Sequence, residues 1–367
     1  MNRREFFGMT AAGVAALSDA RFSWAQNADP KVDWKKIRPA TLDRISIMSL
    51  NFQSILKVPD TQDSPARTLE LTDLGEMIAD TYGVHKVEFQ HYHFASVEPS
   101  YFKDMRSRLE KTKSRATQIN LEFSNLNISA PQQRDRLLAI DLTRMWVDHA
   151  VALGAQRVMI NQGNPTHENK AVAIPALKAM VDYGKSKNII VSVETRGSGG
   201  GGRGNRGAGA GTAGSAAAGA PAGAAGAASG TAPAASPATG AGAPQAAATQ
   251  PGAQGAPPAG PPPLTGPAVW ELLAEIIKGA GSYSNVDVGG ANAANQEELH
   301  RCLRMMFPMT AGTMHTRVNP RWDLATAMRF LENELGYKGL YTIEASNGHE
   351  GTRAIYDVVV ATLDTKT

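Results

Sequence analysis

The sequence predicts an α/β protein with the architecture of a (β/α)8 barrel, and three observations support this class. Short apolar runs typical of strands alternate with helical patterns from about residue 40 onward. Eight such pairs of strand and helix occur, which is the number that the barrel needs. Without residues 1–25 and a low-complexity segment at residues 197–265, the chain is also close to the roughly 250 residues typical of this fold.

The expected elements follow from these alternating patterns. The strands are short runs rich in β-branched and apolar residues, each followed by a loop. They cover Ile45–Leu50, His85–Phe89, Ile119–Phe123, Arg157–Ile160, Ile189–Glu194, Tyr283–Val288, Ala311–His315 and Leu340–Glu344. The expected helices cover Thr68–Thr81, Tyr101–Thr112, Gln132–Leu153, Ala171–Lys187, Pro267–Lys278, Gln296–Met306, Trp322–Leu335 and Thr352–Leu363. Residues 41–196 would supply the first five strands and 266–367 the last three.

Residues 197–265 interrupt this order directly after the fifth strand. They are almost entirely Gly, Ala, Pro, Ser, Thr and Gln, with Arg203 and Arg206 as the only charges and no aromatic residue. Such a composition cannot bury enough apolar surface to offset the entropy of ordering, so we expect a disordered insertion. Three interpretations of this insertion remain open. It is a low-complexity expansion without function, a flexible cover over the neighbouring site, or a tether to the cell envelope.

The N-terminus has the pattern of a twin-arginine signal peptide over residues 1–25. Arg3 and Arg4 precede two phenylalanines and a weakly apolar stretch, and Ser23-Trp24-Ala25 offers small residues for cleavage. The apolar stretch is shorter than the about 20 residues that span a membrane, so no stable membrane insertion is expected. Export to the periplasm or cell envelope is therefore the predicted localisation, with a disordered basic start as the alternative. Residues 26–40 would form an N-terminal extension.

Composition narrows the classes of partner. The formal net charge is +3 and 19% of the 367 residues are charged, without a basic run after the N-terminus. Nucleic-acid binding usually needs a concentrated basic face, so we expect a small-molecule ligand instead. The single cysteine, Cys302, lies in a helical pattern and is interpreted as a buried apolar residue rather than a nucleophile.

Four polar residues end four consecutive strands of the C-terminal half. Glu194 and Asp287 are 93 positions apart, of which 69 belong to residues 197–265, which leaves 24. Asp287 and His315 are then 28 positions apart, and His315 and Glu344 are 29 apart. Because one strand-and-helix unit of the barrel takes roughly 30 residues, these side chains advance one strand at a time, and barrel enzymes carry their chemistry at such strand ends.

Three carboxylates and one imidazole in this arrangement are a suitable ligand set for a divalent cation. Each residue alone has an ordinary structural explanation, such as a helix cap or an Asx turn. Together, converging carboxylates would repel one another unless a cation lies between them. We expect one divalent metal ion, with Mn²⁺ preferred and Mg²⁺, Co²⁺ and Zn²⁺ as alternatives, because the ligand set does not discriminate strongly among them.

With these residues in place, the chain from Ile45 onward, without residues 197–265, resembles the xylose isomerase-like TIM barrel superfamily. Within it, the similarity is to the sugar phosphate isomerase/epimerase proteins that include the ketose 3-epimerases. The resemblance implies that Glu194, Asp287, His315 and Glu344 hold the metal. It also implies that Glu194 and Glu344 form the acid/base pair and that Arg321 binds substrate. Family members often associate through their barrels, so a homo-oligomer is a further implication.

The sequence also departs from the pattern of the ketose epimerases. Those enzymes have a histidine where Gly290 stands here, and Arg196 follows the fifth-strand glutamate where a histidine or asparagine is common. A guanidinium suits two-point recognition of a carboxylate or phosphate, so Arg196 is a candidate for binding a more anionic substrate. Arg317 is a second candidate, with a solvent-facing salt bridge as the alternative.

His91 and His93 follow the second strand in the segment Glu88-Phe89-Gln90-His91-Tyr92-His93. At positions i and i+2 of an extended segment, the two rings would point to the same side. A wall that binds the sugar, a second metal pair and plain loop packing are the three interpretations. We assign both histidines to substrate binding.

The predicted function is a sugar isomerase or epimerase that acts on a small-molecule sugar or glycoside. A glutamate would remove a proton next to a metal-bound carbonyl, and the other glutamate would return it. A lyase or hydratase acting on oxidised (3-keto) sugars or glycosides is the first alternative. A non-catalytic sugar-binding barrel is the second, and an apurinic endonuclease is disfavoured by the absence of a basic face.

Overall fold

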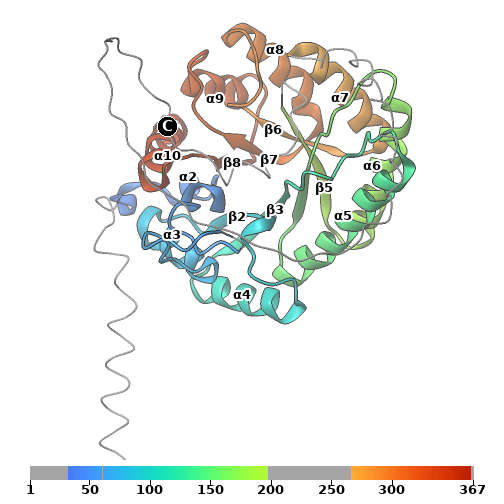
Figure 1. Cartoon of the computed structure of the whole chain (residues 1–367). Coiled ribbons are helices and arrows are strands. Elements are labelled where there is room, and N and C mark those ends of the chain that lie inside the picture. The colour runs from blue at the N-terminus through green and yellow to red at the C-terminus, as the bar shows by residue number, and fades with distance from the viewer. Residues whose placement is uncertain (1–31, 60, 197–265, 365–367) are drawn as a thin grey trace, which may run out of the picture. The chain divides into compact units, whose positions relative to one another are not determined.

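The computed structural model describes residues 32–59, 61–196 and 266–364. The predicted signal peptide and the predicted disordered insertion lie outside these residues. Eight parallel strands form a closed barrel in the order β1 to β8, which confirms the predicted fold class. The first strand pairs with both its neighbours, through Ile47 opposite Val87 and Ile45 opposite Tyr341, and so closes the barrel. Figure 1 shows the helices arranged around the strands.

The strands are short, as a buried parallel sheet requires. They are β1 Ile45–Met48, β2 Lys86–Gln90, β3 Arg115–Leu121, β4 Arg157–Asn161, β5 Ile190–Thr195, β6 Tyr283–Asp287, β7 Thr310–Thr316 and β8 Leu340–Ile343. The helices are α2 Pro39–Leu42, α3 Leu74–Tyr82, α4 Pro99–Lys111, α5 Gln133–Leu153, α6 Lys170–Ser186, α7 Pro267–Ala280, α8 Gln296–Met306, α9 Leu324–Asn333 and α10 Gly348–Asp364. Single 3-10 turns are η2 Trp34–Lys36, η3 Ser49–Phe52, η4 Leu71–Asp73, η5 His91–His93 and η6 Phe307–Met309.

Local signals account for most helix ends. Pro99 and Pro267 occupy the first positions of α4 and α7, where the missing N–H has no partner to lose. Gly154 ends α5 in the left-handed region at a φ of 80°, which glycine adopts without steric cost. The side chain of Asp323 accepts a hydrogen bond from the Thr326 N–H and caps α9.

Three expected elements begin four or more residues away from their observed starts. The last helix was expected from Thr352, but α10 begins at Gly348. The first helix was expected from Thr68, but Leu69 pairs with Leu56 in an isolated β-bridge, and α3 begins only at Leu74. The third strand begins at Arg115, four residues before its expected start. The first half of this strand contains polar residues and so lacks the apolar run typical of a strand. In the structure, Thr117 and Gln118 are buried through hydrogen bonds with other polar side chains.

The apolar core lies between the barrel wall and the helices. Its largest fully buried side chains include Trp270 on α7, Tyr82 on α3, Tyr356 on α10 and Phe102 on α4. The barrel interior is different, because polar side chains on several strands meet there through hydrogen bonds. One such contact joins Ser46 on β1 to Thr117 on β3 at 3.1 Å, and another joins Asn120 on β3 to Glu88 on β2 at 2.6 Å. This polar interior leads to the strand ends that carry the candidate site.

Candidate active site

The structure places the four predicted strand-end residues together at the carboxyl ends of β5 to β8. Glu194 lies on β5, Asp287 ends β6, His315 lies on β7, and Glu344 directly follows β8. Parallel pairing sets Asp287 opposite His315, so neighbouring strands present them at one level. All four side chains are buried, with exposed fractions between 0% and 4%. Ionisable groups at this depth need partners for their charges.

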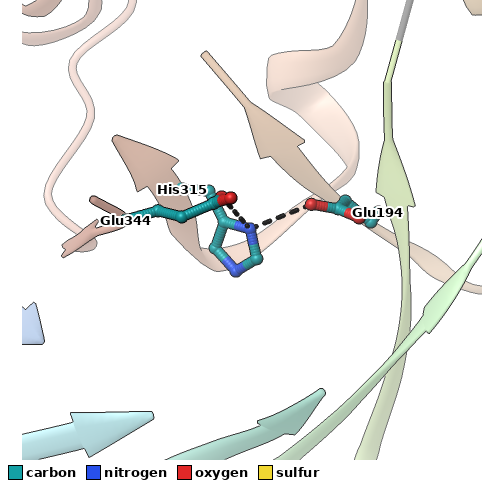
Figure 2. Close-up of side chains that lie close together, drawn as sticks. All are labelled: Glu194, His315 and Glu344. Atoms are coloured by element: carbon teal, nitrogen blue, oxygen red, sulfur yellow. Dashed lines mark hydrogen bonds and ion pairs between the residues drawn. The ribbon is translucent and has the colours of Figure 1, made fainter. Parts of the chain in front are cut away.

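Three of these residues form a compact group of ligand atoms. One atom each from Glu194, His315 and Glu344 lies within 4.8 Å of the others. The Nδ1 atom of His315 is 3.1 Å from Glu194 Oε1 and 3.4 Å from Glu344 Oε2. Figure 2 shows the imidazole ring between the two carboxylates, with both contacts made by the same nitrogen. Carboxylate oxygens with one imidazole nitrogen fit a divalent cation by donor chemistry and spacing.

Asp287 is outside this three-residue group and has other partners. Its Oδ1 accepts a hydrogen bond from the Gly290 N–H at 2.7 Å, and its Oδ2 accepts one from Arg317 Nη2 at 2.6 Å. Burial and the neighbouring carboxylate of Glu344 raise the pKa of Asp287 to about 6, against the opposing effect of Arg317. Its predicted part in holding a metal stays a prediction, and it would require the Arg317 contact to change.

Gly289 and Gly290 make room for the Arg317 side chain. A Cβ atom on Gly290 would overlap Asp287 Oδ2 and Arg317 Nη2, and one on Gly289 would overlap Arg317 Cγ. The space beside Gly290 is therefore filled by the guanidinium of Arg317, the residue that directly follows β7. Arg317 also lies 3.3 Å from Glu344 Oε1, so its charge is shared by two site carboxylates.

Arg196 supplies a second buried positive charge at the end of β5. Its guanidinium contacts Glu194 closely and lies 2.9 Å from Glu122 Oε1. Burial lowers the pKa of Arg196, but Glu194 and Glu122 raise it by more, so the side chain stays charged. For Glu194, burial is outweighed by Arg196 and His315, and its pKa is lowered. Two arginines thus already offset much of the carboxylate repulsion, and that repulsion alone does not require a metal.

Glu88 is a member of the site that the sequence analysis did not assign. Its Oε1 lies 2.6 Å from His315 Nε2, and Asn120 Nδ2 donates to the same oxygen at 2.6 Å. Burial lowers the pKa of His315, but Glu88, Glu194 and Glu344 raise it well above the ordinary value. A signal was present, since a glutamate inside the strand Lys86–Gln90 is costly to bury without a positive partner.

His91 and His93 are both buried, with exposed fractions of 8% and 1%. The Nδ1 of His93 lies 2.8 Å from Ser49 Oγ, and burial lowers its pKa to about 3. The Nδ1 of His91 accepts a hydrogen bond from the Glu122 N–H at 3.0 Å, and the ring packs on Phe123 at 3.6 Å between centroids. Burial lowers the pKa of His91 to about 4. These contacts favour the packing interpretation, while substrate binding by either ring stays a prediction.

Arg321 lies on the loop after β7, and its guanidinium contacts the loop that follows β6. Its Nη1 donates to Asn292 Oδ1 at 2.9 Å and to the Ala293 carbonyl at 3.3 Å. Among the residues that the structure describes, Arg196 and Arg317 are the arginines that contact the site carboxylates. The substrate-binding role of Arg321 stays a prediction.

No family model matches the chain, and no curated protein matches it in sequence. Solved structures of xylose isomerase-like barrels do match its fold. A D-tagatose 3-epimerase-like protein has a TM-score of 0.56 at 15% identity, covering 88% of this chain and 97% of that one. The 3-keto-D-glucoside 4-epimerase YcjR from E. coli has a TM-score of 0.53 at 9% identity, covering 88% and 99%. A probable 3-DHS dehydratase, AsbF, from Bacillus anthracis has a TM-score of 0.51 at 10% identity, covering 88% and 100%.

These neighbours, an epimerase-like protein, an epimerase and a probable dehydratase, share this barrel fold. At such low identities the likeness concerns the barrel itself. Within residues 32–59, 61–196 and 266–364, no helix has the length and apolar character needed to cross a membrane.

Proposed function

We propose that this protein is a metal-dependent sugar isomerase or epimerase with Glu194 and Glu344 as its acid/base pair. The observation that carries the proposal is the position of these two carboxylates on either side of His315 Nδ1, at 3.1 and 3.4 Å. Ligand atoms from all three residues lie close enough to share one ion. The proposal assigns the site one divalent cation, with Mn²⁺ preferred and Mg²⁺, Co²⁺ and Zn²⁺ as alternatives.

When bound, a divalent cation would polarise the carbonyl and hydroxyl oxygens of a sugar and make the adjacent C–H group more acidic. Glu194 or Glu344 then takes that proton onto a carboxylate oxygen. Return of a proton by the other glutamate to the opposite face of the same carbon is epimerisation. Return to the neighbouring carbon is aldose–ketose isomerisation, and both outcomes use general acid/base catalysis by the same pair.

The proposed substrate is a small sugar or glycoside that carries an anionic group. Arg196 and Arg317 both lie at the strand ends, with side chains that are 15% and 23% exposed, respectively. A guanidinium can bind a carboxylate or a phosphate through two parallel hydrogen bonds. Each arginine now contacts site carboxylates, so binding an anionic substrate would require those contacts to be shared or exchanged.

A lyase or dehydratase acting on oxidised sugars or glycosides is the second candidate. It is favoured by the fold shared with a 3-keto-D-glucoside 4-epimerase and a probable dehydratase. The same glutamate would remove the proton, but a leaving group on the neighbouring carbon would depart instead of a proton returning. The products distinguish the two, since elimination releases an aglycone or water and leaves a double bond.

Hydrogen exchange in D₂O is the experiment that separates these functions. The protein is loaded with Mn²⁺ or Mg²⁺ and incubated with neutral and anionic ketoses and with keto-glycosides, and mass spectrometry locates the deuterium. An isomerase or epimerase incorporates deuterium at the carbon next to the carbonyl, while a lyase also releases aglycone. Binding without exchange for any substrate would instead support a non-catalytic sugar-binding barrel.

A matched pair of variants tests the assignment of the base. Glu344→Gln removes a site carboxylate, while Glu334→Gln changes an exposed glutamate that lies 3.3 Å from Arg304 on α8. The proposal requires the first variant to lose exchange from the epimer whose proton faces Glu344, and the second variant to keep exchange from both epimers. Exchange that persists at the wild-type rate from both epimers in Glu344→Gln would remove this residue from the acid/base pair.

Export by the twin-arginine route to the periplasm or cell envelope is part of the proposal. The pair Arg3-Arg4 and the following apolar stretch are the features that support it. Fusing residues 1–26 to a reporter and replacing both arginines by lysine tests the route, because recognition of the signal depends on the guanidinium pair.

A homo-oligomer is also proposed, and the mass in solution from light scattering tests it.

A further inference from the structure

We propose that Glu88 is a positioning residue that holds a proton on His315 Nε2 and thereby presents the Nδ1 lone pair to the bound cation. The inference rests on the proposed metal site and assigns a role to a residue that neither the sequence pattern nor the fold comparison identified. In metal sites generally, a histidine ligand donates its second ring N–H to a carboxylate or carbonyl, which sets the tautomer and the orientation of the ring.

The contact crosses the barrel interior. Glu88 lies on β2 and His315 on β7, and these strands are separated in the barrel by β8 and β1. Their side chains nevertheless meet at 2.6 Å between Glu88 Oε1 and His315 Nε2. The exposed fractions of the two side chains are 0% and 1%, so solvent does not compete for this hydrogen bond.

The opposite side of the ring faces the candidate ligands. Nδ1 lies 3.1 Å from Glu194 Oε1 and 3.4 Å from Glu344 Oε2 (Figure 2). The two nitrogens of His315 therefore have separate surroundings, with Glu88 at Nε2 and the proposed ligand carboxylates at Nδ1. A cation that shares a site with Glu194 and Glu344 meets Nδ1, and Nε2 is left to carry the proton.

A chain of side-chain hydrogen bonds holds Glu88 in place. Asn120 Nδ2 donates to Glu88 Oε1 at 2.6 Å, and Gln118 Nε2 donates to Asn120 Oδ1 at 2.9 Å. Gln118 and Asn120 lie on β3, the strand that pairs with β2, and both are fully buried. The carboxylate is thus oriented by the barrel before any cation binds, which is the arrangement that a positioning residue requires.

Asn285 adds a second neighbour at the same nitrogen. Its Nδ2 lies 2.9 Å from His315 Nε2, and its Oδ1 is buried without a hydrogen-bond partner among the described residues. If Nε2 carries the proton, a half-turn of the Asn285 amide would replace the N–H group that faces the ring by Oδ1, so that two donors no longer face each other, at the loss of the 3.0 Å contact from Nδ2 to Met159 Sδ. Oxygen and nitrogen of an amide are assigned from such networks, so the protonated Nε2 and the turned amide support each other.

Nuclear magnetic resonance of the loaded wild-type protein tests the tautomer directly. The protein is labelled with ¹⁵N-histidine and loaded with diamagnetic Zn²⁺ or Mg²⁺, and long-range ¹H–¹⁵N correlation distinguishes the two ring nitrogens. His315→Gln identifies the signal. The expected result is a protonated Nε2 and a cation-bound Nδ1, and the opposite assignment would overturn the proposal without any variant of Glu88.

Metal affinity of Glu88 variants is the second test, measured by calorimetry or by electron paramagnetic resonance of free Mn²⁺. Glu88→Ala should weaken binding by about 10- to 100-fold, the range seen when such a partner is removed. Glu88→Gln keeps an oxygen that can accept from Nε2, so its affinity should lie between Glu88→Ala and wild type. Partial recovery of metal affinity in Glu88→Gln would show that the oxygen bonded to His315 matters, and not merely the packing of the side chain.

Glu332→Gln is the matched control, because it also neutralises a buried glutamate. Glu332 lies on α9, where its carboxylate is 2.6 Å from Arg44 and accepts a hydrogen bond from the Tyr341 hydroxyl at 2.8 Å. It should lower the stability of the fold while leaving metal affinity at the wild-type value. Equal affinities for Glu88→Ala and wild type, in folded protein, would overturn the role of Glu88.

The failure of this inference differs from failure of the proposed function. If the wild-type protein binds none of the four cations, the proposed metal site fails and the inference fails with it. If wild type binds metal and exchanges hydrogen while Glu88→Ala does both equally well, only the positioning role fails.

Discussion

Arg317 Nη2 lies 2.6 Å from Asp287 Oδ2, and the same guanidinium reaches Glu344 Oε1 at 3.3 Å. One positive group thus joins two carboxylates that the sequence pattern assigned to a metal. Two glycines make this arrangement possible, since a Cβ at either Gly289 or Gly290 would overlap the arginine. The guanidinium and a divalent cation would therefore compete for the same oxygens.

Replacing Arg317 by Gln should strengthen metal binding. The change removes both a competitor for Asp287 Oδ2 and a positive charge that repels the cation in a buried site. We expect the Kd for Mn²⁺ to fall by about tenfold, which corresponds to about 1.4 kcal/mol. Calorimetric titration measures it, and Arg321→Gln serves as the control because the Arg321 guanidinium donates to Asn292 and Ala293 on a neighbouring loop. Weaker binding in Arg317→Gln would instead identify Arg317 as an organiser of the ligands.

Much of the fold could be predicted because the spacing of apolar residues along the sequence indicates each strand and helix separately. Glu194 and His315 were placed at strand ends because each closes an apolar run, and the closed barrel confirms the predicted fold class. The third strand was placed too late because its inward side chains, such as Gln118, are polar and mask the strand pattern. A period-two signal depends on an apolar interior, which this barrel lacks.

The partners within the site could not be predicted from spacing. Glu88 and His315 are 227 positions apart and meet across the barrel, a relationship that no local pattern encodes. Arg317 was left open between substrate binding and a solvent-facing salt bridge, and the structure shows it turned inward between carboxylates. The residues at the strand ends could be predicted from the sequence. Their ion pairs could not, because those depend on side-chain directions that are set only when the barrel closes.

Gly290→Ala should destabilise the protein because the new methyl group would occupy the space of Asp287 Oδ2 and Arg317 Nη2. Overpacking of this kind costs about 1–3 kcal/mol. Chemical denaturation measures the loss, and a double-mutant cycle with Arg317→Gln identifies its origin. Part of the cost should disappear when the arginine is absent, whereas strictly additive effects would show that the guanidinium does not limit the space.

Stability should fall in mild acid through the buried His91. Burial lowers the pKa of this imidazole to about 4 from an ordinary 6.5, so the unfolded chain takes up the proton first as the pH falls. Titration of His91 therefore leaves the free energy of unfolding unchanged above about pH 6.5. It lowers that free energy steadily between pH 6.5 and 4, and causes no further loss below pH 4. The shift corresponds to about 3 kcal/mol.

His91→Asn tests this titration, because asparagine keeps an acceptor for the Glu122 N–H but has no proton to gain. Denaturation of both proteins at several pH values between 4 and 7.5 gives the difference in unfolding free energy. The difference should favour wild type most at neutral pH and shrink toward pH 4. A difference that stays constant across this range would mean that His91 titrates normally in the folded protein.

Glu194→Gln and Glu344→Gln should separate the two proton transfers. Loss of one general acid or base typically costs 10²–10⁴ in rate, so each variant should slow overall turnover by at least about a hundredfold. For epimerisation, the substrate whose proton faces the remaining carboxylate should still exchange with solvent, while its epimer should not. Deuterium incorporation measured from each epimer separately gives this pattern. Equal residual exchange from both epimers would favour a single base.

Metal removal provides the last prediction, since a cation that binds the folded site stabilises it by mass action. At a free Mn²⁺ concentration of about 100 times Kd, the gain in unfolding free energy is about 2.7 kcal/mol. Treatment with a chelator should therefore lower Tm, and added Mn²⁺ should restore it in proportion to the logarithm of its concentration. The variant His315→Gln should lose most of this dependence, because Nδ1 is the one imidazole donor among Glu194, His315 and Glu344. Glu332→Gln should keep the dependence in full, although its Tm starts lower, because the Arg44 contact is remote from the three ligand atoms. Wild-type protein whose Tm is unchanged by chelator and by each divalent cation would mean that Arg196, Arg317 and a protonated His315 balance the site carboxylates without a metal.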